Sequence, residues 1–339
     1  MLPTRVSAVA TQFEAFYDRR KGGYSKDARD ESFLRELNEY LEPRERELYD
    51  DVEIAAPFVF VLGLPRSGTT LLSQLLAYCL DVGYVDNVAA RFWLAPVHGL
   101  RLSRGLVGGE TERPAFESDY ARTADLRGIH EFGYFWRHWL RKESFGDVAH
   151  ARDREDEIDW AGLRRTLANM QEELGGRPFA AKNALASYHL PRLRAELGQV
   201  VYVYVERDPL DVAVSILDAR RKYYSDPATW WSYMPPEVEE LAGLDYWEQI
   251  AGQVHYLARF YERTLPEAGE DVVVRTTYEA LCRNPRGVLD EVTGRSRETY
   301  GAEIGIAANP PAAFPFRTHA DRSEEKQRFG ALLARLAAG

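Results

Sequence analysis

Residues 58–70 read Phe58-Val59-Phe60-Val61-Leu62-Gly63-Leu64-Pro65-Arg66-Ser67-Gly68-Thr69-Thr70, and they set the architecture of the whole chain. An unbroken apolar run followed by a turn with glycine and proline is typical of a strand buried on both faces. The segment from Thr70 to Tyr78 then has the composition of a helix packed on that strand. The sequence therefore predicts a strand, a loop and a helix in succession.

The same alternation returns later in the chain. Apolar segments predict further strands at 178–181, 200–205 and 272–274, and helices are predicted from about 209 to 221 and from about 245 to 263. Strands that alternate with helices indicate an α/β fold with a mainly parallel sheet flanked by helices. No internal repeat or low-complexity linker interrupts the 339 residues, so we expect one domain over 1–339.

Two segments do not fit the alternation. Residues 1–55 predict a helical N-terminal extension, since Phe33, Leu34 and Leu37 recur at helical spacing. Residues 84–176 predict a mostly helical insertion with an aromatic stretch from Phe132 to Trp139. The sequence does not indicate what the N-terminal extension does.

Composition excludes several classes of protein. The formal net charge of −10 argues against a general nucleic-acid binder, because such proteins neutralise phosphates with surplus Lys and Arg. Two cysteines, Cys79 and Cys282, are too few for a disulfide framework and do not form a metal or redox pair, so we expect buried thiols. The N-terminus resembles neither a secretion signal nor a membrane span, and we predict a cytoplasmic protein with no membrane span and no metal.

The loop after the first strand is suited to bind phosphate. Its backbone N–H groups and the positive end of the following helix point at a bound anion, and the hydroxyls of Ser67, Thr69 and Thr70 add donors. The spacing from Gly63 to Gly68 matches the loop of nucleoside triphosphatases, but Thr69 stands where their lysine reaches the β- and γ-phosphates. An ordinary turn without a ligand is the simpler alternative.

Pro65-Arg66-Ser67-Gly68-Thr69-Thr70 resembles the P-[RK]-S-G-T-[TS] loop of the sulfotransferases that use 3′-phosphoadenosine-5′-phosphosulfate (PAPS), at every position. The resemblance implies a P-loop NTPase-like sulfotransferase fold with helical insertions. It also implies that Arg66 contacts the bridging or sulfuryl oxygens, while the backbone from Ser67 to Thr70 holds the 5′-phosphate. No metal is required in such a site.

A second motif resembles the family's 3′-phosphate site. Arg207-Asp208-Pro209 follows the strand at 200–205, and Ser215 comes eight positions after the arginine. Arginine can grip a phosphate with two parallel N–H bonds, and a serine hydroxyl can complete the pocket. Taken alone, the motif is better explained by ordinary capping at a helix start, and the phosphate loop reverses that preference.

Two further segments resemble family motifs more loosely. The segment ending at Lys182 resembles the family's lysine-containing segment, although Asn183-Ala184 replaces its usual continuation, and a solvated surface lysine is the alternative. Tyr278 starts a Y-E-x-L segment that borders the adenine in the family, where it either stacks on the base or packs in the core.

The acceptor side is less determined. Removal of the acceptor's hydroxyl proton needs a general base. His130 and Glu131 in the insertion are the leading candidates, with Asp86 and His98 behind them, and each has an ordinary structural role as its alternative. Aromatic residues that either line an acceptor pocket or belong to the core are Phe92-Trp93, Tyr134-Phe135-Trp136 and Trp230-Trp231-Ser232-Tyr233.

These observations predict a PAPS-dependent sulfotransferase that transfers a sulfuryl group to an acceptor hydroxyl and releases 3′,5′-bisphosphoadenosine. Arg66 and Lys182 would stabilise charge on the leaving group. The insertion 84–176 is expected on the acceptor side, with a slight preference for a saccharide acceptor. A P-loop small-molecule kinase and a non-catalytic nucleotide-binding module are the alternatives, and the oligomeric state is open.

Overall fold

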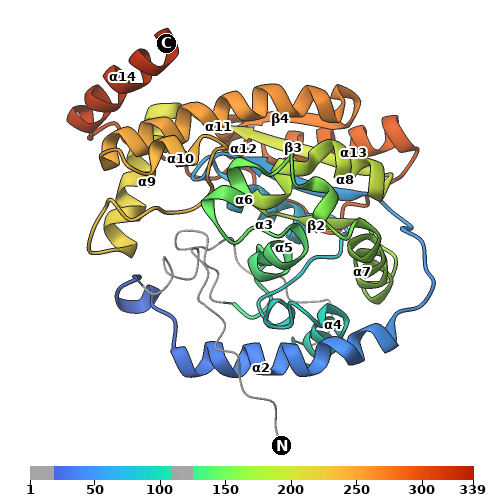
Figure 1. The fold of residues 1–339 in the computed structure, drawn as a ribbon. Helices are drawn as coiled ribbons and strands as arrows, with labels where there is room; N and C mark the ends of the chain where they lie inside the picture. Colours follow the sequence, from blue (N-terminus) through green and yellow to red (C-terminus); the bar gives the residue numbers. More distant parts are fainter. Residues whose placement is uncertain (1–18, 108–115, 117–124) are drawn as a thin grey trace, which may run out of the picture.

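The computed structural model describes residues 19–107, 116 and 125–339 (Figure 1). Four strands form one sheet in the order β2-β1-β3-β4, and all neighbouring strands are parallel. They are β1 (Phe58–Gly63), β2 (Phe179–Ala181), β3 (Val200–Glu206) and β4 (Val273–Thr277). Each coincides with a predicted strand, so the predicted parallel α/β sheet is confirmed.

The sheet is buried on both faces, as the unbroken apolar strand sequences require. Side chains of β1 alternate between two hydrophobic cores, because successive residues of a strand point to opposite faces. Phe58, Phe60 and Leu62 join the core on one face. Val59 and Val61 join the core on the other.

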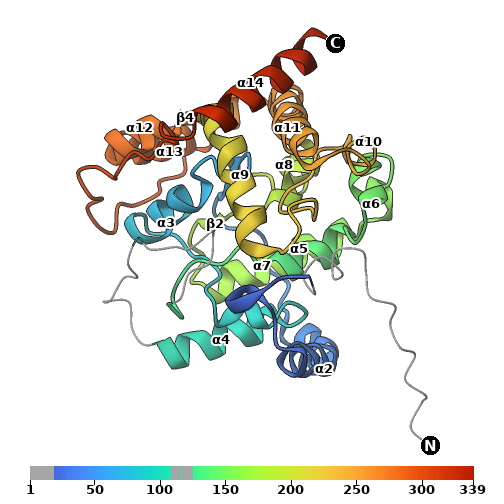
Figure 2. The same cartoon turned by 90° about the vertical axis from the view of Figure 1, so that its left-hand side faces the viewer.

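Helices cover each face of the sheet (Figure 2). The face of Val59 and Val61 packs against α3 (Thr69–Cys79), α12 (Tyr278–Arg283) and α13 (Pro285–Tyr300). The opposite face carries the larger group, α5 (Gly133–Leu140), α7 (Trp160–Glu173), α8 (Leu190–Leu197), α9 (Pro209–Tyr223) and α11 (Tyr246–Ala268). The predicted helices after the first and third strands are confirmed as α3 and α9, and the long one as α11.

The remaining helices lie at the periphery. They are α2 (Ala28–Glu45), α4 (Pro96–Val107), α6 (Phe145–Ala149), α10 (Val238–Leu241) and α14 (Ser323–Ala338). Short 3-10 turns are η1 (Gly22–Tyr24), η2 (Arg46–Leu48), η3 (Ala89–Arg91), η4 (Glu155–Glu157), η5 (Ala184–His189) and η6 (Glu270–Val272). Helix α2 lies far from the strands, at the lower edge of Figure 1. The predicted N-terminal helix is therefore present within 28–45, whereas residues 1–18 lie outside the described part.

Polar side chains in the core hold α2 against α4. Asn38 accepts a hydrogen bond from the Leu94 N–H (2.8 Å) and donates one to the Arg91 carbonyl (2.8 Å). Glu45 is buried and accepts from the Val97 N–H at the start of α4 (2.7 Å). Since buried polar groups need partners, these contacts fix where the extension sits.

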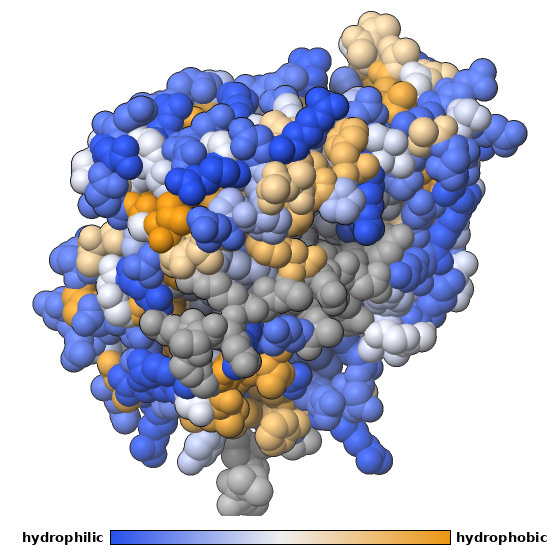
Figure 3. Space-filling view, turned by 180° about the vertical axis from the view of Figure 1, so that it is seen from behind, coloured by the Kyte–Doolittle hydropathy of each residue, from blue (hydrophilic) through white to orange (hydrophobic). Residues whose placement is uncertain are grey.

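The surface shows no dominant apolar area on the face drawn in Figure 3, where the coloured residues are mainly hydrophilic with small separate apolar groups. Both cysteines are buried, as predicted. Across residues 19–107 and 125–339, no helix combines the length and the apolar character needed to cross a membrane. Within the same residues, no cluster of three or more His, Cys, Asp or Glu side chains has the arrangement of a metal site.

Candidate active site

At the carboxyl edge of the sheet, each strand is followed by a residue or segment that the sequence predicted to belong to the site. The phosphate loop follows β1, Lys182 follows β2, Arg207 follows β3 and Tyr278 follows β4. Ligands in sheets of this kind bind at the carboxyl ends of the strands. All four segments line one cavity of about 1250 Å³, so the sheet brings together residues that lie up to some two hundred positions apart.

The phosphate loop needs glycine at both ends. Gly63 has φ +148° and Gly68 has φ +107°, and Arg66 between them also has a positive φ of 69°. A Cβ at Gly63 would lie 2.8 Å from the Val205 carbonyl oxygen, and one at Gly68 would lie 2.6 Å from the ring of Tyr278. The loop is thus wedged between the ends of β3 and β4, and the backbone conformation is one that L-residues rarely adopt.

The loop presents hydrogen-bond donors with no partner inside the helix that follows. Helix α3 starts at Thr69, and the first N–H groups of any helix lack an intrahelical acceptor. The Ser67 hydroxyl is buried and has no hydrogen-bond partner within the described residues. Unsatisfied donors beside the positive end of a helix are what an anion such as a phosphate requires. The residues present therefore fit the anionic donor that the loop sequence predicts.

Arg66 and Ser215 are in contact, although the sequence suggested two separate anion sites. The Arg66 Nε donates to the Ser215 Oγ (3.0 Å), and the Arg207 Nη1 donates to the Arg66 carbonyl oxygen (2.7 Å). The Arg207 Nη2 donates to the Arg317 carbonyl oxygen (2.7 Å). The two predicted groups thus form one continuous cationic surface along the cavity.

The capping alternative for the second motif holds for the aspartate alone. The Asp208 carboxylate accepts from the Asp211 N–H (2.9 Å) and caps α9. Arg207 instead reaches back to the phosphate loop and lies over the Tyr278 ring, with 4.4 Å from its guanidinium carbon to the ring centroid. The capping interpretation is therefore confirmed for Asp208, whereas binding of the 3′-phosphate by Arg207 and Ser215 stays a prediction.

Tyr278 packs against the phosphate loop and remains at the cavity wall. Only 8% of the residue is exposed, and burial raises the pKa of its phenol, so the ring stays neutral. Its ring faces Phe316 at 5.5 Å. The ring lies beside Gly68. Its contact with adenine stays a prediction.

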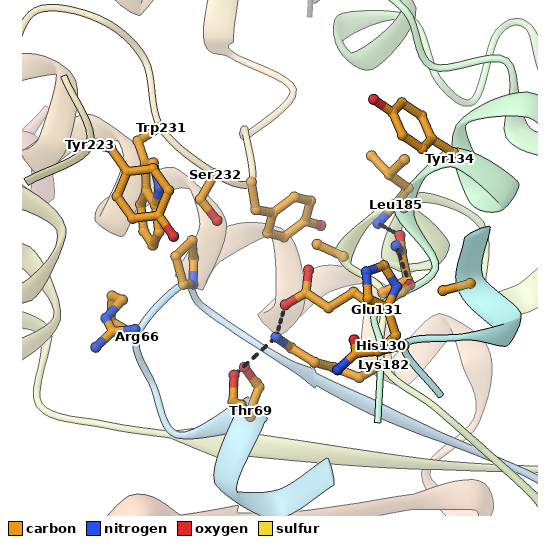
Figure 4. Close-up of a pocket in the computed structure, with 18 of the residues that line it drawn as sticks. Arg66, Thr69, His130, Glu131, Tyr134, Lys182, Leu185, Tyr223, Trp231 and Ser232 are labelled. Atoms are coloured by element: carbon orange, nitrogen blue, oxygen red, sulfur yellow. Dashed lines mark hydrogen bonds and ion pairs between the residues drawn. The ribbon is translucent and has the colours of Figure 1, made fainter. Parts of the chain in front are cut away.

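Lys182 joins the phosphate loop to the insertion. Its Nζ donates to the Thr70 Oγ1 (3.2 Å) and forms an ion pair with Glu131. The neighbouring Asn183 donates to the Glu131 carbonyl oxygen (2.9 Å). Only 14% of the lysine side chain is exposed, so it is not a solvated surface lysine. Figure 4 shows Lys182 and Glu131 between Arg66 on one side and Tyr134 on the other.

His130 and Glu131 both line the cavity but differ in what they can accept. The His130 Nδ1 already accepts the Phe132 N–H (2.8 Å). Burial lowers the pKa of His130, with the Glu131 charge opposing this, so the ring is neutral and carries its hydrogen on Nε2. A ring in this state has no nitrogen lone pair left to take a proton, whereas the Glu131 carboxylate has.

The two lesser base candidates have structural roles. Asp86 accepts from the backbone N–H groups of Val88 (3.0 Å) and Ala89 (2.8 Å), and its other oxygen accepts from Ser103. His98 lies 2.5 Å from the Glu45 carboxylate under α2. Neither lines the cavity, so their ordinary structural alternatives are correct.

The aromatic stretches divide between cavity and core. Trp93 and Tyr134 line the cavity, whereas Phe135 and Trp136 are buried in the core. Trp230, Trp231 and Tyr233 do both, since they are buried in the core and also line the cavity beside Ser232. The fully buried Arg220 fixes the loop before α10 by donating to Gln249 (2.7 Å) and to the Pro227 carbonyl (3.3 Å). This loop lines the cavity and also packs on the insertion, since the Trp230 ring lies 6.2 Å from the Phe145 ring.

Several cavity residues were not anticipated. Lys26 and Glu31 come from the N-terminal extension, and Arg317 and His319 come from the segment before α14. No local motif marks any of them, because none follows a strand. A lysine and a glutamate close together in a polar segment usually indicate only a solvated helix face.

Comparisons with known proteins bear on the family. A sequence profile of the sulfotransferase family matches residues 57–295. No curated protein matches the chain at a significant level. Among solved structures, a sulfotransferase from Mycobacterium tuberculosis is 17% identical, with a TM-score of 0.49 and coverage of 90% of this chain and 86% of that one. A sulfotransferase from Mycobacterium avium is 18% identical, with a TM-score of 0.47 and coverage of 88% and 72%.

A third structure is the sulfotransferase domain of the olefin synthase from Synechococcus, which is 17% identical, with a TM-score of 0.39 and coverage of 85% of this chain and 97% of that domain. The family assignment depends on the profile, which spans more than half of the 339 residues and includes the phosphate loop, Lys182 and Arg207. This chain belongs to the sulfotransferase family.

Proposed function

We propose that this sulfotransferase uses PAPS as its donor and transfers the sulfuryl group to a hydroxyl of a saccharide. The observation that carries the proposal is the chain of contacts from Ser215 through Arg66 to the phosphate loop, and from Thr70 through Lys182 to Glu131. It places groups suited to an anionic donor beside a carboxylate suited to activate an acceptor.

The donor's two phosphates need two sets of cationic or N–H groups. The 5′-phosphosulfate would lie on the first turn of α3, where the N–H groups and the buried Ser67 hydroxyl point. The 3′-phosphate would lie near Arg207 and Ser215, and its binding would require these side chains to exchange their present partners for the phosphate. Adenine would lie toward Tyr278.

Transfer is an in-line displacement. The acceptor oxygen forms a bond to sulfur while the bond from sulfur to the bridging oxygen of the 5′-phosphate breaks, and 3′,5′-bisphosphoadenosine leaves. The acceptor's proton passes to the Glu131 carboxylate. Arg66 and Lys182 offset the charge that develops on the leaving oxygen.

Glu131 is a better base than His130 in this arrangement. The histidine's Nδ1 is occupied by the Phe132 N–H, and its pKa is lowered by burial. Glu131 retains carboxylate lone pairs beyond the ion pair with Lys182, and its side chain is 43% exposed to the cavity and solvent. We therefore assign the proton transfer to Glu131 and leave His130 a role in shaping the turn before α5.

Donor identity is tested by binding. Calorimetry of the purified protein with 3′,5′-bisphosphoadenosine should give saturable one-site binding without magnesium, and the nucleotide should raise the melting temperature. ATP with magnesium should give neither effect. Binding of ATP with magnesium in place of the bisphosphate would favour a kinase and overturn the proposal.

Catalysis is tested separately with radiolabelled donor and a set of hydroxyl acceptors. Bisphosphate binding without transfer to any of them would favour the non-catalytic nucleotide-binding module. A cytoplasmic location stays a prediction from the sequence.

A further inference from the structure

The N-terminal extension reaches the cavity and is anchored there. The Lys21 N–H donates to the Tyr223 carbonyl oxygen (2.9 Å), and Arg20 and Tyr224 form an antiparallel bridge. The Tyr24 ring lies against the Tyr223 ring, with 4.1 Å between centroids. These contacts attach the segment to the end of α9, the same helix that carries Ser215 near its middle.

Three side chains close a hydrogen-bonded triangle on the cavity wall. The Tyr134 hydroxyl donates to the Glu31 Oε2 (2.6 Å), and the Lys26 Nζ also donates to Glu31 Oε2 (2.8 Å) and contacts the Tyr134 oxygen. Lys26 and Glu31 are only 25% and 30% exposed. Within the described residues no hydrogen bond uses the Glu31 Oε1, so one carboxylate oxygen is available to a ligand.

An aromatic surface lies beside this triangle. The Trp93 ring is 4.7 Å from the Tyr134 ring, and both residues line the cavity together with Lys26 and Glu31. Sugars present apolar C–H groups on one ring face and hydroxyls around the rim. An aromatic face with a charged hydrogen-bonding group at its edge matches both features, whereas a lipid chain would need an apolar wall throughout.

Helix α2 has anchors besides the triangle. The second half of α2 is fixed by Asn38 and Glu45, which bond to backbone groups at the start of α4 and before it. Tyr134 could satisfy its hydroxyl with water, since it is only part-buried. A partly buried lysine and glutamate that line a cavity, on a segment that has other anchors, suit a binding role.

We propose that Lys26, Glu31 and Tyr134, with Trp93, form the subsite that orients the saccharide acceptor, so that the N-terminal extension determines acceptor specificity. This inference depends on the proposed sulfotransferase function and adds the acceptor-recognising residues to it. The subsite lies across the cavity from the donor loop, as the position of Tyr134 opposite Arg66 in Figure 4 shows.

The test uses two conservative variants with matched controls on α2. Glu31→Gln and Tyr134→Phe keep the side-chain shape and remove one hydrogen-bonding function each. Glu39→Gln and Tyr40→Phe make the same chemical changes at exposed positions of α2. Transfer from radiolabelled PAPS is measured with a panel of methyl hexopyranosides and with 4-methylphenol, and bisphosphate binding is measured by calorimetry.

We expect the wild-type protein to sulfate at least one glycoside, and both test variants to raise its KM about tenfold with kcat nearly unchanged, since each loses one hydrogen bond to a charged group. Bisphosphate affinity and both control variants should match wild type.

Transfer to 4-methylphenol alone, or to no glycoside, would overturn the saccharide subsite while bisphosphate binding still supports the sulfotransferase proposal. An unchanged glycoside KM in both test variants would overturn the role of the triangle. Absence of bisphosphate binding by the wild-type protein would overturn the proposed function itself, and this inference with it.

Discussion

The donor half and the acceptor half of the cavity are built in different ways. The donor half consists of the segments that directly follow β1, β2, β3 and β4. The acceptor half is assembled from the N-terminal extension, from the segment around α5 and from the loop before α10. In a parallel sheet the carboxyl ends of the strands lie at one edge, so the positions of the donor-half segments follow from the sheet. The positions of the three peripheral segments do not follow from any single strand or helix.

The two halves also differ in how they would bind their ligands. The donor half offers backbone N–H groups held by a tight loop, with Gly63 and Gly68 at the positive φ values that glycine readily adopts. Such groups need no particular side chains beyond glycine, and under the proposed function they would bind a phosphate that is the same in every donor molecule. The acceptor half offers side chains such as Glu31, Tyr134 and Trp93, which can change while the fold persists. A single cavity can therefore combine one way of binding the donor with an acceptor specificity that side-chain substitutions change.

The largest effect is expected in the donor half, from Arg66→Ala. Removing the guanidinium deletes both the charge beside the leaving group and the contact with Ser215, and kcat should fall about 10³-fold. Steady-state transfer assays would measure this, with Arg44→Ala on the exposed side of α2 as the control. A near-normal kcat in Arg66→Ala would show that Arg66 does not take part in the transfer step.

Glu131→Gln should have the next largest effect on kcat, because Glu131 lies where the donor half and the acceptor half meet. Glutamine can still accept from Lys182 but cannot take a proton, so kcat should fall about 10²-fold while bisphosphate binding stays within about twofold. His130→Gln serves as the comparison and should lose less than about tenfold. A greater loss in His130→Gln than in Glu131→Gln would reverse the assignment of the base.

Gly68→Ala tests whether the phosphate loop requires glycine at this position. The added Cβ would meet the Tyr278 ring and the backbone would keep an unfavourable φ, so bisphosphate affinity should fall at least about tenfold and the melting temperature should drop. Gly105→Ala in α4 is the matched control, since no atom lies within 4 Å of the position that its new methyl group would occupy and alanine favours helices. Equal stability and affinity in the two variants would show that position 68 does not require glycine.

The smallest effect concerns His130 and pH. Its pKa is lowered by burial in the folded protein, so below about pH 6.5 the unfolded chain binds a proton that the folded protein does not. Stability should therefore decrease as the pH falls through that value, and His130→Gln should lessen the decrease. Melting temperatures between about pH 7.5 and about pH 5.5 would measure it. The same pH dependence in wild type and variant would contradict the buried, neutral state of the ring.

The sequence by itself predicted the four strands, the phosphate loop and the residues that follow each strand. These features are local: an apolar run buries itself on both faces, a glycine permits a positive φ, and a parallel sheet must bring its carboxyl ends to one edge. Arg66, Lys182, Arg207 and Tyr278 could therefore be named from short motifs, and each lines the cavity.

Only the tertiary structure decided what these residues contact. Ser215 accepts from Arg66, and Lys182 pairs with Glu131, which lies 51 positions earlier in the chain. Glu31 and Tyr134 meet from 103 positions apart, and no pattern in either segment predicts the contact. Such pairs depend on how the peripheral helices pack against the sheet, because packing brings together side chains that are distant in sequence. The sequence around each residue does not indicate which residue it will contact.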